Sequence, residues 1–202
     1  MSPIVLASGS PRRQEYFQLL GLPFTVLNTN IDENLPAQTD PQKLTAELAV
    51  KKVEAAIELL KENPPEWICG ADTVVALNNK IYGKPEDRKE AAEMLLALSG
   101  RQHEVFTSVA LYSKNHGKID CRSASCLVSF APLSLAEIEW YLGKKEWQGA
   151  AGAYRLQGLA SCFITKISGA PSTVVGLPLQ EFYDMLRKNN YPYGGSLNCN
   201  LC

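Results

Sequence analysis

The sequence predicts an α/β fold, and three features of the chain support it. Short apolar runs that suit strands, such as residues 67–77, roughly alternate with segments whose apolar residues recur at helical spacing, such as residues 41–60. No internal repeat or low-complexity stretch interrupts this alternation. The 202 residues are enough for one large domain or for two lobes around a shared sheet. We therefore expect one domain over residues 1–190, followed by a flexible C-terminal tail at residues 191–202, where Gly and Asn are frequent.

The composition is that of an ordinary soluble enzyme. Apolar residues make up 46% of the chain, charged residues 20%, and the formal net charge is −1. This balance gives no sign of a broad nucleic-acid or membrane surface. No apolar run approaches the ~20 residues of a membrane span, and the N-terminal residues lack the charged region of a signal peptide. We expect a cytoplasmic protein with neither nucleic acid nor membrane as a partner.

The six cysteines do not predict a disulfide framework. Four of them lie in strand-like apolar runs and are best read as small buried hydrophobic residues. The other two, Cys199 and Cys202, have C-x-x-C spacing but no second pair of Cys or His nearby. A metal or redox role for this pair stays an open alternative.

The first predicted elements are a strand from residue 4, a helix, and a second strand at residues 24–27. The helix begins after Ser10 and Pro11, because a serine hydroxyl can accept a free N–H of the first turn and proline has no N–H to leave unpaired. It ends at Gly21, which suits the left-handed position that follows a helix.

The residues of the turn between this strand and this helix indicate an anion-binding site. Ser8 and Ser10 supply hydroxyls, while Arg12 and Arg13 lie at the positive end of the helix dipole, where cations are disfavoured. Backbone N–H groups and forked guanidiniums at such a place suit phosphate oxygens. A phosphorylated ligand is the favoured interpretation. The alternative is a capped surface helix whose arginines pair with carboxylates elsewhere.

A long helix begins at Asp40 and Pro41, and its two adjacent lysines are not equivalent. Helical geometry places Lys52 about 40° from Leu48, at the edge of the buried face, whereas Lys51 points to solvent. A lysine at such a margin is often only extending its amine to water. A role for Lys52 therefore needs corroboration from elsewhere in the sequence.

The apolar strand at residues 67–77 supplies that corroboration. It carries Asp72 and Thr73, and a buried aspartate is costly unless it is paired. We expect the strand to deliver the carboxylate to a cleft, where a metal or another cation keeps it ionised. A turn-capping role for the aspartate is the alternative. Asn78-Asn79 predicts a tight turn, after which the returning strand brings Lys84 near Asp72.

The second half of the chain continues the alternation. Residues 105–112 and 119–130 predict two antiparallel strands at an edge of the sheet, after a helix at residues 90–98. Ser134-Leu-Ala-Glu137 is a capping box that begins a helix ending at Gly143. The last expected elements are a ligand-approaching loop of small and polar residues at 147–158, a strand at 162–167 and an amphipathic helix after Pro178.

Seven short motifs follow one another between residues 4 and 188. They are Ser8-Gly-Ser10-Pro-Arg12-Arg13, Ile31-Asp-Glu33, Glu47-Leu-Ala-x-x-Lys52, Gly70-Ala-Asp72-Thr73-Val-Val, Gly83-Lys84-Pro85, Ala151-Gly-Ala-Tyr154-x-x-Gln157-Gly158 and Val174-Val-Gly-Leu-Pro178. In order and spacing they resemble the Maf family of nucleotide pyrophosphatases. The resemblance implies a mixed twisted sheet with flanking helices in two lobes around a cleft, similar to inosine triphosphate pyrophosphatases. It also implies a homodimer and a reaction dependent on a divalent metal, Mg²⁺ or Mn²⁺, that converts a nucleoside triphosphate to its monophosphate and pyrophosphate.

Matching the motifs assigns roles to individual residues. Asp72 corresponds to the proton acceptor of the family and Glu33 to the other active-site acid, and we expect these two to hold the metal. Arg12, Thr73 and Gln157 match positions associated with substrate choice, and Lys52 and Lys84 match phosphate-facing lysines. Gln157 resembles the dTTP/UTP branch, whereas a Glu at that position accompanies the 7-methyl-GTP branch. On this basis Ser8, Ser10, Arg12, Arg13, Lys52 and Lys84 are expected to bind the triphosphate, and Thr73 and Gln157 to contact the substrate.

One position departs from the family pattern. A lysine often precedes Ala-Gly-Ala-Tyr, but this chain has Ala150 there. Arg155 can replace the missing charge if it faces the ligand, although the alternation of the segment also allows it to face solvent. Two other classes of function are weighed against the enzyme: a non-catalytic nucleotide-binding regulator of cell division and a phosphopeptide-binding module. The four charged residues Glu33, Lys52, Asp72 and Lys84 argue against both.

Overall fold

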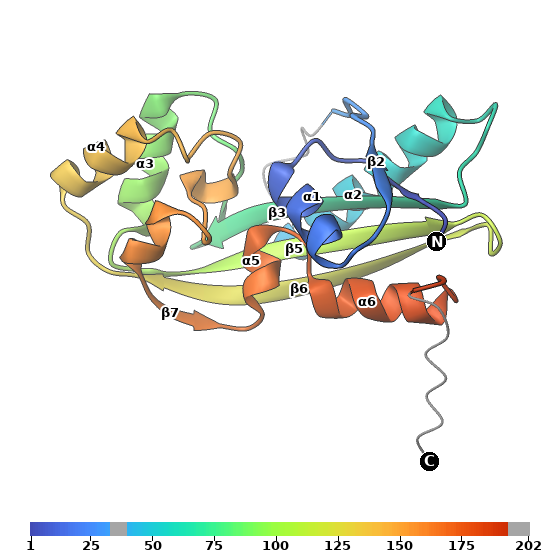
Figure 1. Cartoon of the computed structure of the whole chain (residues 1–202). Coiled ribbons are helices and arrows are strands. Elements are labelled where there is room, and N and C mark those ends of the chain that lie inside the picture. The colour runs from blue at the N-terminus through green and yellow to red at the C-terminus, as the bar shows by residue number, and fades with distance from the viewer. Residues whose placement is uncertain (33–39, 194–202) are drawn as a thin grey trace, which may run out of the picture.

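A computed structural model of the chain describes residues 1–32 and 40–193. Within these residues the strands form one seven-stranded mixed sheet of order β2-β1-β3-β5-β6-β7, with β4 paired to β3 (Figure 1). β1 runs parallel to β2 and β3, and the other neighbouring strands are antiparallel. The predicted α/β fold with a mixed sheet and flanking helices is confirmed.

The strands are β1 (Ile4–Leu6), β2 (Phe24–Val26), β3 (Trp67–Leu77), β4 (Lys80–Tyr82), β5 (Gln102–Ser113), β6 (Lys118–Phe130) and β7 (Ile164–Ser168). The helices are α1 (Pro11–Leu19), α2 (Pro41–Leu59), α3 (Arg88–Leu98), α4 (Leu135–Gly143), α5 (Pro171–Val175) and α6 (Leu179–Lys188), with short 3-10 turns at Ala151–Ala153 and Leu159–Phe163. None of the helices in the described part of the chain is long and apolar enough to cross a membrane.

Consecutive side chains of the long strands face opposite sides of the sheet and so meet different helices. On β5, Val109 packs in a cluster with Phe17 of α1 and Phe182 of α6, whereas the next residue, Ala110, packs with residues of α2. The rings of Phe17 and Phe182 lie 5.3 Å apart between their centroids. Thus α1 and α6 cover one face of the sheet and α2 covers the other.

The helices also divide along the length of the strands, as Figure 1 shows. At one end α3, α4 and the two 3-10 turns share a core that includes Leu95, Tyr141 and Phe163. At the other end lie α1, α2, β1 and β2. Between these two groups the edge of β3 is open: β1 pairs with residues 67–69 and β4 with residues 75–77, so no described strand pairs with residues 70–74 on that side. This gap corresponds to the expected cleft between two lobes.

The structure confirms several predictions that rest on short stretches of neighbouring residues. Pro11 is the first residue of α1, and Gly21 follows that helix with φ +64°. Ser134 and Glu137 form the predicted capping box of α4. Asn78 and Asn79 both have positive φ, 51° and 62°, as a tight hairpin turn requires.

Two expectations about the strands were wrong. The β5–β6 hairpin is not at an edge of the sheet, because β7 pairs with the outer side of β6. The last strand begins at Ile164, since the residues before it form a 3-10 turn. At the start of the expected tail, Tyr191 is buried and its hydroxyl donates to the carbonyl of Ser2 at 2.8 Å, and the Tyr193 hydroxyl donates to the carbonyl of Leu20. The rest of the expected tail, with Cys199 and Cys202, lies outside the described residues.

The cysteines that the structure describes are all free thiols. Cys69 and Cys126 are buried, as expected of small hydrophobic residues, whereas Cys121 is half-buried and Cys162 is exposed. Cys162 lies in the 3-10 turn at Leu159–Phe163 and not in a strand.

Candidate active site

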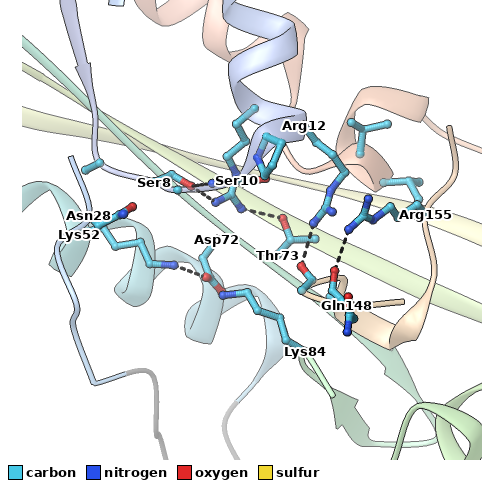
Figure 2. Close-up of a pocket in the computed structure, with 18 of the residues that line it drawn as sticks. Ser8, Ser10, Arg12, Asn28, Lys52, Asp72, Thr73, Lys84, Gln148 and Arg155 are labelled. Carbon is cyan, nitrogen blue, oxygen red and sulfur yellow. Dashed lines mark hydrogen bonds and ion pairs between the residues drawn. The ribbon is translucent and has the colours of Figure 1, made fainter. Parts of the chain in front are cut away.

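A cavity of about 470 Å³ opens at the gap beside β3. Its volume is in the range of small-molecule sites. Figure 2 shows that segments distant in the sequence converge on it. The lining comprises the β1–α1 turn, the segment after β2, one residue of α2, the centre of β3, the residue Lys84 after β4, the loop before and after the first 3-10 turn, and the end of α5.

Asp72 and Lys52 form an ion pair in this cavity. Lys52 Nζ donates to Asp72 Oδ1 at 2.6 Å, and the two residues are only 6% and 4% exposed. The neighbouring Lys51 is exposed, so the predicted difference between the two lysines is confirmed.

Gly70 allows this pair to form. A Cβ at residue 70 would lie 2.7 Å from the carbonyl oxygen of Ala49 and 2.9 Å from Cγ2 of Val53, both on α2. The helix therefore packs on β3 at a distance that only glycine permits. That close approach carries Lys52 to the carboxylate two residues further along the strand.

Arg13 is buried and bonded to protein atoms through all three of its nitrogens. Nε donates to the carbonyl of Gly176 at 2.8 Å, Nη1 to Ser8 Oγ at 2.7 Å and Nη2 to Thr73 Oγ1 at 3.2 Å. Thr73 Oγ1 also accepts a hydrogen bond from Thr107 at 3.0 Å. The guanidinium thus joins the β1–α1 turn, β3 and the link between α5 and α6 at one point behind the cavity.

Arg12 and Arg155 lie together on the side of the cavity away from Lys52 (Figure 2). Arg12 Nη2 donates to the carbonyl of Gly149 at 3.0 Å, and Arg155 Nη2 donates to that of Gln148 at 2.8 Å. Burial, and then the positive charges of Arg155 and Arg13, lower the pKa of Arg12 from 12.5 to about 10. The structure therefore turns Arg155 toward the cavity, one of the two orientations that its sequence context allows.

The two serines of the turn differ in their contacts. Ser8 is held by Arg13 and accepts a long hydrogen bond, 3.3 Å, from the backbone N–H of Ser10. Ser10 occupies the N-cap position of α1, but its hydroxyl caps no backbone N–H, contrary to the prediction. Both serines line the cavity, so the uncapped helix start faces it.

The remaining predicted site residues are placed as follows. Thr73, Lys84 and Gln157 all line the cavity, and in Figure 2 the Lys84 side chain extends toward Asp72. Glu33 lies outside the described residues. Within residues 1–32 and 40–193 no three His, Cys, Asp or Glu side chains are grouped to hold a metal ion.

Sequence reasoning gave no role to three cavity residues, Asn28, Gln148 and Tyr154. Asn28 follows β2, which runs parallel to β1, and the carboxyl ends of parallel strands are where ligands bind in open α/β sheets. Applied to the sequence, this rule would have identified Asn28 as a candidate site residue. The Tyr154 hydroxyl lies within hydrogen-bond distance, 2.9 Å, of Nε2 of the buried His103. No local sequence pattern encodes this contact.

An α/β protein with a cavity that gathers Ser, Lys and Arg side chains around one buried carboxylate is suited to a phosphorylated ligand. Comparison with known proteins agrees with this class, since the model of the Maf-like protein family matches residues 3–189. The chain belongs to this family.

Two relatives illustrate the similarity. A dTTP/UTP pyrophosphatase of Pelotomaculum thermopropionicum is 41% identical over 191 residues, which are 95% of this chain and 98% of the relative. A dTTP/UTP pyrophosphatase of Shigella dysenteriae is 41% identical over 190 residues, which are 94% of each chain. Among solved structures, the Staphylococcus aureus Ham1 protein matches 64% of this chain and 72% of its own, with a TM-score of 0.44 and 14% identity.

Proposed function

We propose that this protein hydrolyses dTTP and UTP to the nucleoside monophosphate and pyrophosphate. The observation that carries the proposal is the position of Asp72, a buried carboxylate at the open edge of β3 with Lys52 on one oxygen. The names of the 41% identical relatives support the choice of substrate.

In the proposed reaction Asp72 accepts a proton from the water that attacks the α-phosphorus. The bond between that phosphorus and the oxygen bridging to the β-phosphate breaks, and pyrophosphate leaves. Because Lys52 holds Oδ1, the carboxylate is fixed in orientation toward the cavity. Lys84 and Arg12, which line the same cavity, supply positive charge to the phosphates.

A divalent cation, Mg²⁺ or Mn²⁺, is part of the proposal. The carboxylate of Asp72 offers the hard oxygen that such cations prefer, and we assign Glu33 as the second carboxylate ligand. When bound, the cation neutralises phosphate charge and lowers the pKa of water.

Arg13 receives a different role from the one its sequence context suggests. With its three nitrogens on Ser8, Thr73 and Gly176, it acts as a positioning residue that holds the phosphate-facing turn against β3. The Ser10 hydroxyl is a better candidate than Arg13 for a phosphate contact, because it does not cap a backbone N–H of α1.

We assign base recognition to Gln157, whereas Thr73 Oγ1 is already hydrogen-bonded to Arg13 and Thr107. An amide can donate and accept at once, so Gln157 can pair with the edge of uracil or thymine. Gln157 is exposed at the cavity, where a base can reach it. Gln157→Glu is expected to lower kcat/KM for UTP and dTTP relative to purine nucleotides, and unchanged selectivity would remove Gln157 from this role.

The test is pyrophosphate release from a panel of UTP, dTTP, CTP, GTP and 7-methyl-GTP, each with and without Mg²⁺. The proposal predicts the fastest release from UTP and dTTP, and only with the metal. A protein that binds these nucleotides but releases no pyrophosphate would be a non-catalytic regulator, and preference for 7-methyl-GTP would place it in the other branch of the family.

The homodimer, the cytoplasmic location, the absence of nucleic-acid and membrane partners and the single domain over residues 1–190 stay predictions. Light scattering of the purified protein tests the first of them, with a mass near twice the 22.2 kDa of the chain expected.

A further inference from the structure

Two arginines from distant parts of the chain share one wall of the cavity. Arg12 comes from the first turn of α1 and Arg155 from the loop after the first 3-10 turn. Their Nη2 atoms bind the carbonyls of two consecutive residues, Gly149 and Gln148, at 3.0 and 2.8 Å, which brings the guanidiniums side by side (Figure 2).

These two charges have no described carboxylate between them. Neither arginine forms an ion pair within the described part of the chain, where the ion pairs involve other residues. Glu15 acts on Arg12 only as a weak opposing charge, smaller in effect than burial, Arg155 and Arg13. Like charges held together and partly desolvated are costly unless an anion lies against both.

The hydrogen bonding of Arg155 is also incomplete. It donates through Nη2, but its Nε is buried without an acceptor. A guanidinium has five N–H donors, so the Nη groups that face the cavity can still bind a ligand. Ala150, at the other end of this loop, is 2% exposed, so its position faces the protein interior and Arg155 is the cation that the loop presents.

The arginines lie on the opposite side of Thr73 from Asp72 and Lys52 (Figure 2). We infer that Arg155, together with Arg12, binds the terminal phosphate of the triphosphate and, after cleavage, the departing pyrophosphate. This role rests on the proposed function, because that function puts the α-phosphorus beside Asp72. A dianionic phosphate between the guanidiniums neutralises both and can accept forked hydrogen bonds from each.

The affinities of the two reaction products, measured separately, distinguish the possible roles of Arg155. Calorimetric titration of inorganic pyrophosphate and, separately, of UMP, both with Mg²⁺, is done on the wild type, Arg155→Met and Arg155→Lys. Arg101→Met is the matched control, because Arg101 is exposed and its side chain makes no described hydrogen bond or ion pair. Arg155→Met is expected to raise the Kd of pyrophosphate by ~10-fold or more and to leave that of UMP within about twofold, since charge-assisted hydrogen bonds are lost only to the former. Arg155→Lys should fall between, because it keeps the charge and loses the fork.

Three outcomes would overturn the inference. Weaker UMP binding with unchanged pyrophosphate binding would move Arg155 to the base or ribose. Equal weakening of both, with a lower melting temperature, would make it a structural residue, and no change in either would leave it outside the site. If the wild type binds both products but releases no pyrophosphate from UTP, the proposed function fails while the assignment of Arg155 to pyrophosphate binding stands on its own titration.

Discussion

Replacing Lys52 with Met isolates the ion pair on which the geometry of the cavity depends. The change keeps the length of the aliphatic stem on α2 and removes the ammonium group, so Asp72 Oδ1 loses its donor at 2.6 Å. Unit charges at that distance attract by about 6 kcal/mol at an effective dielectric of about 20. Breaking a buried pair from one side typically costs about 3–5 kcal/mol, because the remaining charge stays desolvated.

Asp72 borders the cavity, where water can replace part of the lost contact. We therefore expect the lower end of this range, about 3 kcal/mol off the free energy of unfolding. Urea denaturation at pH 7 measures it. Lys51→Met provides the control, since it makes the same chemical change one residue away at an exposed position and should cost no more than about 0.5 kcal/mol. Equal effects of the two substitutions, or a more stable Lys52→Met protein, would refute the reasoning.

Three further substitutions probe the supports of the site. Arg13→Met removes the hydrogen bonds to Ser8, Thr73 and Gly176 and should lower the unfolding free energy by about 3 kcal/mol in urea denaturation. A variant within about 0.5 kcal/mol of wild type would show that the guanidinium does not hold these segments together. Gly70→Ala forces α2 away from β3 and should cost about 1–3 kcal/mol and reduce UTP turnover, whereas Gly143→Ala, with open space around its Cβ, should do neither; like behaviour of the two variants would contradict the close-approach argument. Burial lowers the pKa of His103 to about 4, below its unfolded value of 6.5, so the unfolded chain binds the extra proton and stability falls as pH drops from about 7 toward 4. This residue should contribute about 2 kcal/mol of the loss between pH 7 and pH 5, measured as the difference in pH dependence between wild type and His103→Gln, and parallel curves for the two proteins would exclude it.

The sequence predicted best those features that neighbouring residues determine. Pro11 and Gly21 mark the ends of the first helix because φ and the missing N–H are properties of single residues. The position of Lys52 at the edge of the buried face followed from helical phase, and a cation beside the buried Asp72 followed from the strand pattern. The sequence did not identify Lys52 as that cation.

Features that depend on distant segments were not predictable in the same way. The β5–β6 hairpin was placed at an edge because nothing in its own residues shows that β7 pairs beyond it. Arg13 was expected to face phosphate, yet one of its acceptors is the carbonyl of Gly176, 163 residues further along. The contact between His103 and Tyr154 spans 51 residues, and each residue alone is equally consistent with other partners.

The most direct test of the proposed chemistry is single-turnover and steady-state pyrophosphate release from UTP by Asp72→Asn, with UTP affinity measured in parallel by equilibrium titration. An amide keeps the shape of the side chain but cannot serve as the proton acceptor at neutral pH. The expected result is a kcat lower by ~10²-fold or more with a UTP dissociation constant close to that of the wild type. Turnover at the wild-type rate would contradict the assignment of Asp72 as the proton acceptor.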